Sequence, residues 1–152
     1  MLKRILLPSG VALTLALLWF AVNSYRTATP LAEENLRGVA LSISAAVENI
    51  VASEPSFRSL DTLRPKDLAF LAVVDRYGRY RFHSNPDLIG SSASDPRYPE
   101  LLRRGTTMEG RVLLGTGEKA YEFLSPIRLA GQTMILRLTL HTYRADAVIR
   151  KA

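Results

Sequence analysis

The first pattern along the chain is a long apolar run near its start. Ile5 to Val22 contains no charged residue, and about 18 helical residues rising 1.5 Å each approach the ~30 Å of a bilayer core. Lys3 and Arg4 precede the run, which favours a cytoplasmic N-terminus. We expect residues 1–26 to form a cytoplasmic start and a transmembrane helix, with the rest of the chain outside.

A cleaved signal peptide is the alternative reading of this run, because a basic start and an apolar stretch are common to both. The run is longer than the usual ~7–15 residues of a signal peptide, and no small-x-small site follows Val22. The pattern therefore favours an uncleaved anchor.

A second helix is predicted over 30–53. Thr29 could cap it and Pro30 suits its first turn. Apolar residues then recur at helical spacing: Leu36, Val39, Ala40, Ile43, Val47, Ile50 and Val51. This stripe could pack on its own domain or on a second copy, and we expect a homodimer through this helix.

The remaining apolar segments have strand length and are separated by turn residues. Strands are expected over 69–74, 79–84, 110–114, 120–127 and 132–140, with a loop over 85–99, a short helix over 98–104 and an exit helix over 143–152. Successive hairpins indicate one antiparallel sheet with helices on one face. The fold class is α+β, with the sheet and its loops over 69–140.

The hairpin between the first two strands carries candidate binding chemistry. Its DRYG turn has Asp75 first and Gly78 last, as a type I turn prefers. Strict alternation would place Arg79, Arg81 and His83 on one face and Tyr80, Phe82 and Ser84 on the other. Guanidinium and imidazole donors could then converge on an anion, although a lone histidine at a strand end is commonly a surface or capping residue.

Composition excludes several classes of protein. The chain has no cysteine, so disulfides and thiolate metal sites are absent. The net charge of +6 comes from scattered arginines without a nucleic-acid-binding motif, so nucleic acid is not an expected partner.

Catalysis is not expected either. The two histidines, His83 and His141, lie in no GxSxG, HExxH or P-loop pattern. We expect no enzyme, no metal and no cofactor in this chain, and His141 is interpreted as structural.

Two segments resemble a known family. VVDRYGRYRFHSNPDLIG, followed by YEFLSPIRLAGQTMILRLTL, is similar to the PDC or single Cache domain, a PAS-like extracytoplasmic sensor of bacterial transmembrane histidine kinases and chemoreceptors. The similarity covers roughly residues 30–150. It implies a long N-terminal helix packed on a five-stranded antiparallel sheet, in agreement with the pattern above.

The resemblance also bears on the ligand. In citrate- and fumarate-sensing members, arginines stand three residues before the histidine and four before the later proline. Here those positions hold Tyr80, before His83, and Glu122, before Pro126. A di- or tricarboxylate ligand is therefore not expected.

Together these observations predict a periplasmic sensor domain, over 27–150, of a two-component histidine kinase in the bacterial inner membrane. A small molecule would bind between the sheet and the 85–99 loop, where the candidate lining residues are Tyr80, Arg81, His83, Tyr121, Phe123 and Arg137. Arg137 stands among aliphatic residues, so it either faces away from them or is buried with a partner. A chemoreceptor sensor, an anchored protein-interaction module and a small secreted enzyme are the alternatives.

Overall fold

The structure is a computed structural model that describes residues 2–54, 56–129 and 131–143. The chain divides into two compact units, of which the second, Leu36–Tyr143, contains the whole sheet. The predicted exit helix over 143–152 lies, from residue 144 onward, outside the described residues.

The N-terminal helix α1, Leu2–Ser53, is continuous over 52 residues and so extends through both units. The expected new helix start at Thr29 is therefore wrong. Proline within a helix removes one N–H and costs about 3 kcal/mol. The helix nevertheless continues through Pro30, and the good helix formers Leu31, Ala32, Glu33 and Glu34 follow directly after it.

Two parts of α1 are apolar for different reasons. Ala32–Ser53 is long and apolar enough to cross a membrane, but 28% of that stretch is buried. Its buried positions recur on one side, at Leu36, Ala40, Ile43, Val47 and Val51, as in a helix that packs on a core. In Leu13–Ser24, a shorter apolar stretch, Leu13, Leu15, Leu17, Leu18, Trp19 and Phe20 are all exposed. Such an all-round apolar surface suits lipid, and the transmembrane segment over 5–22 stays a prediction.

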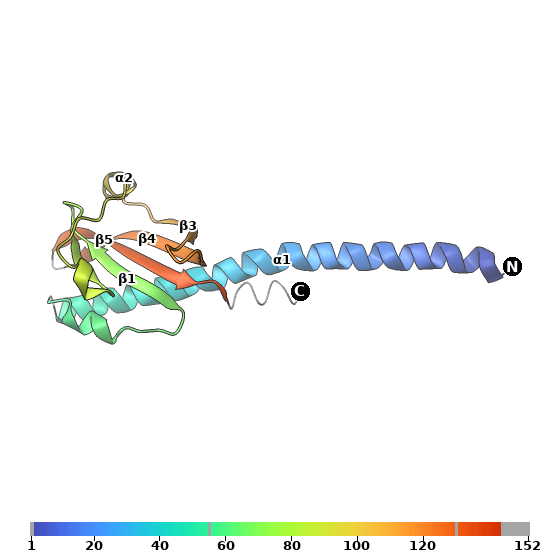
Figure 1. Ribbon diagram of the computed structural model, residues 1–152, viewed down its shortest axis with the longest axis horizontal. Coiled ribbons are helices and arrows are strands. Elements are labelled where there is room, and N and C mark those ends of the chain that lie inside the picture. Colours follow the sequence, from blue (N-terminus) through green and yellow to red (C-terminus); the bar gives the residue numbers. More distant parts are fainter. Residues whose placement is uncertain (1, 55, 130, 144–152) are drawn as a thin grey trace. The chain divides into compact units, whose positions relative to one another are not determined.

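The sheet confirms the predicted α+β class (Figure 1). Its strands are β1 Leu68–Val74, β2 Tyr80–His83, β3 Met108–Leu113, β4 Lys119–Leu129 and β5 Gln132–His141. They pair antiparallel in the order β2-β1-β5-β4-β3. The short helical segments are η1 Arg58–Thr62, η2 Pro86–Leu88 and α2 Tyr98–Arg104.

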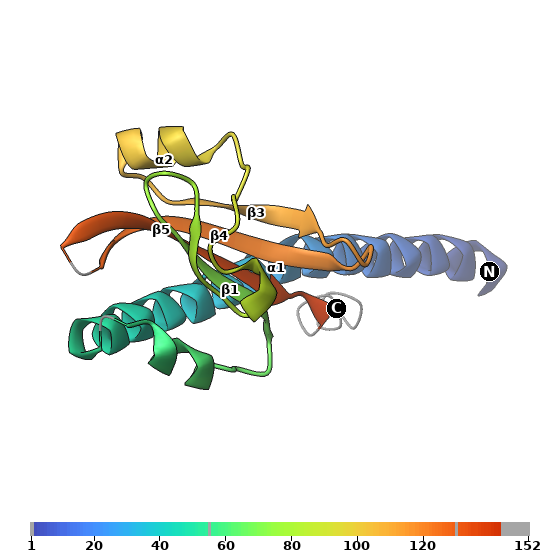
Figure 2. The ribbon, with the colours of Figure 1, turned by 60° about the vertical axis from the view of Figure 1, so that its left-hand side comes forward.

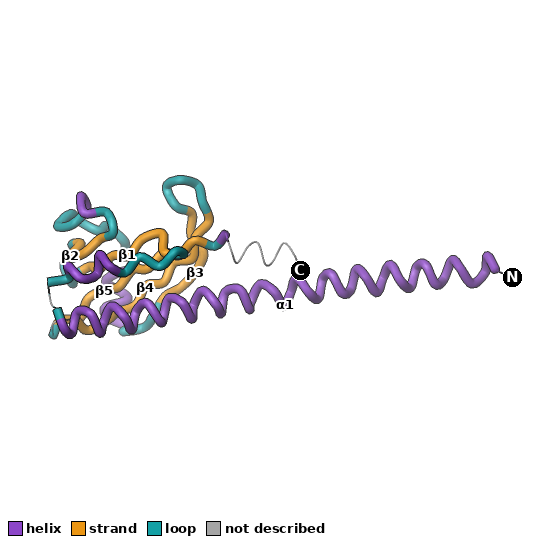
Figure 3. Tube along the Cα trace, turned by 90° about the horizontal axis from the view of Figure 1, so that it is seen from below, coloured by secondary structure: helices purple, strands orange, loops and turns teal. Residues whose placement is uncertain are grey.

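Helices cover both faces of the sheet, which corrects the expectation of helices on one face. Residues 36–53 of α1 run beside one face, which we call the helix face (Figure 3). The segment 85–107, which contains α2, lies over the other face of the sheet (Figure 2). We call this segment the covering segment and the face beneath it the loop face. Strand β1 is apolar on both faces, and the middle of β5 is buried on both, so each face needs a cover. Val74, Ala93, Tyr98, Leu101, Leu124 and Ile135 form the core under α2.

A β-bulge in β2 changes which side chains share a face. Val73 pairs with Phe82 but Val74 pairs with Tyr80, so Arg81 is the extra residue. Tyr80 and His83 consequently lie on the same, loop, face, and their ring centroids are 5.0 Å apart. The predicted strict alternation over 79–84 is wrong at this residue, and Arg81 is exposed.

The predicted DRYG turn is confirmed, and it anchors the covering segment. Gly78 N–H donates to the Asp75 carbonyl at 3.0 Å, and Asp75 Oδ1 accepts from two further backbone amides. Gly78 has φ +74°, which favours glycine. Its carbonyl accepts from Ala93 N–H at 2.6 Å. The turn thus fixes where the covering segment meets β2.

We expect Gly78→Ala to lower the free energy of unfolding by about 1 kcal/mol, because a side chain disfavours the left-handed backbone. Urea unfolding of the full chain in a neutral detergent measures this. Gly110→Ala is the matched control, since Gly110 lies in β3 with no positive φ and open space around a Cβ. Equal losses in the two variants would contradict the argument.

Candidate functional site

The structure separates the six predicted site residues into three groups. Tyr80, His83 and Arg137 lie on the loop face, because their strand partners Val74 and Ala72 do. The other three predicted residues do not join them.

Tyr121 and Phe123 are buried on the helix face. Tyr121 donates its hydroxyl to Glu109 at 2.5 Å, and Glu109 also pairs with Arg37 of α1 at 3.5 Å. Arg81 is exposed on the bulge. The loop face is therefore the candidate binding surface, and Tyr121 and Phe123 belong to the packing of α1.

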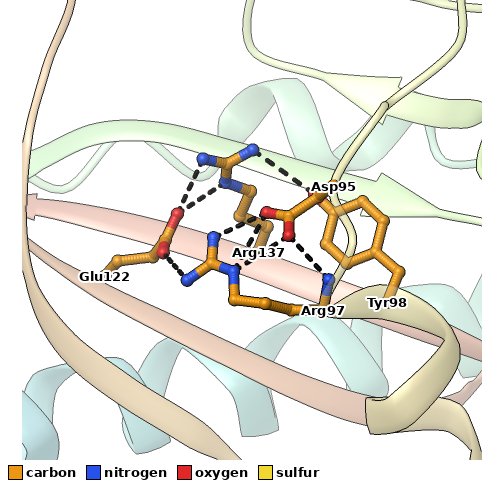
Figure 4. A network of polar contacts seen from close by, with 5 residues as sticks. All are labelled: Asp95, Arg97, Tyr98, Glu122 and Arg137. Atoms are coloured by element: carbon orange, nitrogen blue, oxygen red, sulfur yellow. Dashed lines mark hydrogen bonds and ion pairs between the residues drawn. The ribbon is translucent and has the colours of Figure 1, made fainter.

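A charged cluster occupies the middle of the loop face (Figure 4). It consists of Asp95, Arg97, Tyr98, Glu122 and Arg137. Glu122 is its centre, with only 2% of its surface exposed. One carboxylate oxygen accepts from Arg137 Nε at 2.8 Å and forms an ion pair with Nη2 at 2.7 Å, and the other accepts from Arg97 Nη1 at 2.7 Å. This cluster joins β4, β5 and the covering segment.

Asp95 holds Arg97 in place within the covering segment. Asp95 Oδ1 accepts from the Arg97 backbone N–H at 3.0 Å, and Oδ2 accepts from Arg97 Nη2 at 2.6 Å. The side-chain hydrogen bonds from Arg97 lower the pKa of Asp95, and those to Asp95 and Glu122 raise the pKa of Arg97. Both groups are therefore charged over the physiological pH range.

An aromatic group lies beside the cluster on the same face. It consists of Phe70, Tyr80 and His83: the His83 ring stacks on Phe70 at 5.4 Å and meets Tyr80 edge-on. Arg137 Cζ lies 5.3 Å from the centroid of Phe70, which brings the two sets together.

His83 is a neutral ring held in one orientation. Its Nδ1 accepts from the Asn85 N–H at 2.8 Å, so the neutral ring carries its proton on Nε2. Burial lowers its pKa, and the positive charge of Arg137 acts in the same direction. At neutral pH the ring is therefore a hydrogen-bond donor without charge.

Thr139 adds a buried hydroxyl to this surface. It pairs with Glu122 on β4 and with Phe70 on β1, which places it on the loop face. It is fully buried, and its Oγ1 has no hydrogen-bond partner among the described residues. A polar group between the sheet and its cover would complete its hydrogen bonding.

Sequence reasoning missed the centre of this site. Asp95, Arg97 and Tyr98 lie in or beside a loop that gave no periodic signal. Glu122 did carry a signal, as the one acidic residue in the apolar run AYEFLSPI, opposite the run that contains Arg137. Lone opposite charges in two adjacent apolar strands indicate a buried ion pair. Among the described residues no group of three or more His, Cys, Asp or Glu side chains could hold a metal ion.

Comparison with known proteins places the fold. No protein-family model and no curated protein sequence matches the chain. Among solved structures, the Escherichia coli DcuS sensor domain superposes with a TM-score of 0.53 at 19% identity, over 79% of this chain and 98% of that one. The chain has the PDC fold.

Two chemoreceptor structures have the same PDC fold. The ligand-binding domain of Pseudomonas aeruginosa PctB, in complex with L-Gln, superposes with a TM-score of 0.58 at 18% identity, over 86% of this chain and 57% of that one. A Vibrio parahaemolyticus methyl-accepting chemotaxis protein superposes with a TM-score of 0.50 at 14% identity, over 83% of this chain and 99% of that one. The PDC fold thus serves sensor and ligand-binding domains of more than one receptor class.

The lowered pKa of His83 predicts a pH-dependent stability. Below pH about 6.5, His83 binds a proton in the unfolded chain but remains largely neutral in the folded chain. The stabilising effect of the neutral ring is therefore complete above that pH and is lost as the pH falls. We expect the free energy of unfolding to fall from pH 7.5 toward pH 5, by at most about 1.4 kcal/mol per pH unit from this one group. His83→Gln should reduce that slope in urea unfolding. Identical slopes would show that His83 titrates normally.

Loss of Arg97 should destabilise the covering segment. Arg97→Ala removes the donors that Asp95 and Glu122 share, and we expect a loss of about 2 kcal/mol in urea unfolding. Arg103→Ala is the matched control, because its contact with Glu100 is long, at 3.7 Å, and exposed. That change should stay within about 0.5 kcal/mol. A loss as small for Arg97→Ala would mean that the cluster does not hold the segment.

Proposed function

We propose that this chain is the extracytoplasmic sensing part of a two-component sensor histidine kinase. In this proposal a small molecule binds on the loop face and the resulting conformational change is passed across the membrane. The observation that carries the proposal is the loop face itself. There the charged cluster and the aromatic group lie side by side, under a segment that ion pairs hold in place.

The charge of the cluster favours a small polar ligand without net charge. Arg97 and Arg137 are balanced by Asp95 and Glu122. A di- or tricarboxylate would bring two or more negative charges to a surface that is already neutral. A zwitterion such as the L-Gln bound by PctB brings both signs and disturbs the balance less. The Thr139 hydroxyl and the His83 Nε2–H are candidate polar contacts.

Signalling requires that the ligand favour one of two conformations, because equal affinity for both shifts nothing. Arg97 holds the covering segment to Glu122, and β5 leads from Arg137 to its end at His141. A ligand that changes these contacts would shift the covering segment and β5 relative to each other. We propose that the predicted exit helix over 143–152 carries the change onward.

The membrane and dimer assignments belong to the same proposal. Residues 1–26 would hold the transmembrane helix over 5–22 and residues 27–150 the sensor domain, in the bacterial inner membrane. Leu41, exposed at 51%, is a candidate contact of a homodimer through the helix over 30–53. A chemoreceptor is the second candidate receptor class, because PctB and the Vibrio protein share the fold.

A thermal-shift screen of the full chain in a neutral detergent tests the proposal. A ligand at 100 times its Kd stabilises by about 2.7 kcal/mol. We expect at least one neutral or zwitterionic metabolite to raise the unfolding temperature. His83→Ala should abolish the rise, whereas Arg81→Ala, on the exposed bulge, should keep it. If a broad screen gives no response, the chain is an anchored interaction module; if His83→Ala still responds, the ligand binds elsewhere.

A further inference from the structure

The carboxylate of Glu122 lies between the guanidinium groups of Arg97 and Arg137. We infer that Glu122 is an internal carboxylate ligand, which fills an anion site between Arg97 and Arg137 and so closes that site to free carboxylates. The geometry of this site is that of Arg97, Glu122 and Arg137 alone. Its consequence for ligand choice rests on the proposed function.

The contacts of Glu122 are those of a recognised anion. Each carboxylate oxygen accepts one hydrogen bond from a guanidinium group, at 2.7 and 2.8 Å, and Arg137 Nη2 makes a further ion-pair contact at 2.7 Å. Guanidinium groups are the preferred donors for carboxylates because they are planar and always charged. Arg137 is held in turn by Tyr98, whose hydroxyl accepts a hydrogen bond from Arg137 Nη1 at 3.3 Å.

The two guanidinium groups reach Glu122 from different layers of the fold. Arg137 belongs to the sheet and Arg97 to the segment that covers it. The carboxylate between them therefore links cover and sheet, as a ligand bound at this place would. Its own side chain comes from β4, whose backbone is paired on both sides by β3 and β5. The carboxylate is thus held at its position.

A tethered carboxylate excludes free ones by effective concentration. An intramolecular group at a short tether competes as if it were present at millimolar concentration or above. A carboxylate from solution would have to displace Glu122 and leave its charge buried without donors. We therefore expect no response of the unaltered chain to acetate in the low millimolar range.

Removal of the side chain should open the site to a specific probe. Glu122→Ala removes the methylene and carboxylate groups beyond Cβ, and acetate supplies the same two carbons and two oxygens. The variant leaves Arg97 and Arg137 facing only Asp95, so the site gains one uncompensated positive charge. Acetate should restore the charge balance and the hydrogen bonds.

The experiment is chemical rescue of the full chain in a neutral detergent at constant pH and ionic strength. Acetate titrated against chloride should raise the unfolding temperature of Glu122→Ala by about 5 °C or more, with saturation. Benzoate, which is too large for the space left, should not. Glu122→Gln is the matched control: it removes the charge but fills the space, so acetate should have no effect. A second change, Arg137→Gln, should abolish rescue in Glu122→Ala.

Each outcome decides the matter. If acetate acts on Glu122→Ala no better than chloride, or stabilises the unaltered chain equally, the inference is overturned. Should Glu122→Ala fail to fold in chloride, recovery of folded protein in acetate supports the inference and equal failure in both salts rejects it. Because rescue uses no natural ligand, a metabolite that stabilises the unaltered chain without acetate rescue would keep the proposed function and reject only this inference.

Discussion

The structure of this domain depends on how the buried carboxylate of Glu122 is compensated. A carboxylate that is 2% exposed needs hydrogen-bonding cations, since its desolvation is otherwise prohibitive. The sheet supplies only Arg137 to it, so the second guanidinium comes from the segment that covers the sheet. This requirement places Arg97 over β4 and, with it, the chain that leads into α2. The cover is thus held both by this ion pair and by the hydrophobic core under α2.

Local patterns in the sequence were sufficient for the strands, the Asp75 turn and the α+β class, because alternation and turn chemistry act over a few residues. Two local signals were overridden. The capping signal at Thr29 and Pro30 did not start a helix, since α1 already had turns on its N-terminal side. The bulge at Arg81 has no sequence signature, yet one extra residue reverses the face of every residue beyond it.

The site was harder to predict than the fold, because its side chains come from segments that no local pattern brings together. In β4, alternation allowed either Tyr121 and Phe123 or Glu122 to face the candidate site, and aromatic side chains are common in ligand pockets. Their large apolar area is better buried against the nonpolar side of a helix, and the structure has them there. Arg97 lies in a segment without periodicity, so no pattern in the sequence could bring it to Glu122, 25 residues away.

The balance of charge within the cluster constrains how a ligand can act. In a site with unpaired cations, an anion binds by charge capture and the protein can remain as it is. Here the guanidinium groups already donate to carboxylates, so a ligand that takes hydrogen bonds from Arg137 or Arg97 weakens their bonds to Glu122. The bond from Arg97 to Glu122 is also the one that holds the covering segment to the sheet. In the proposed function, a ligand that takes these donors would therefore be coupled energetically to the position of that segment.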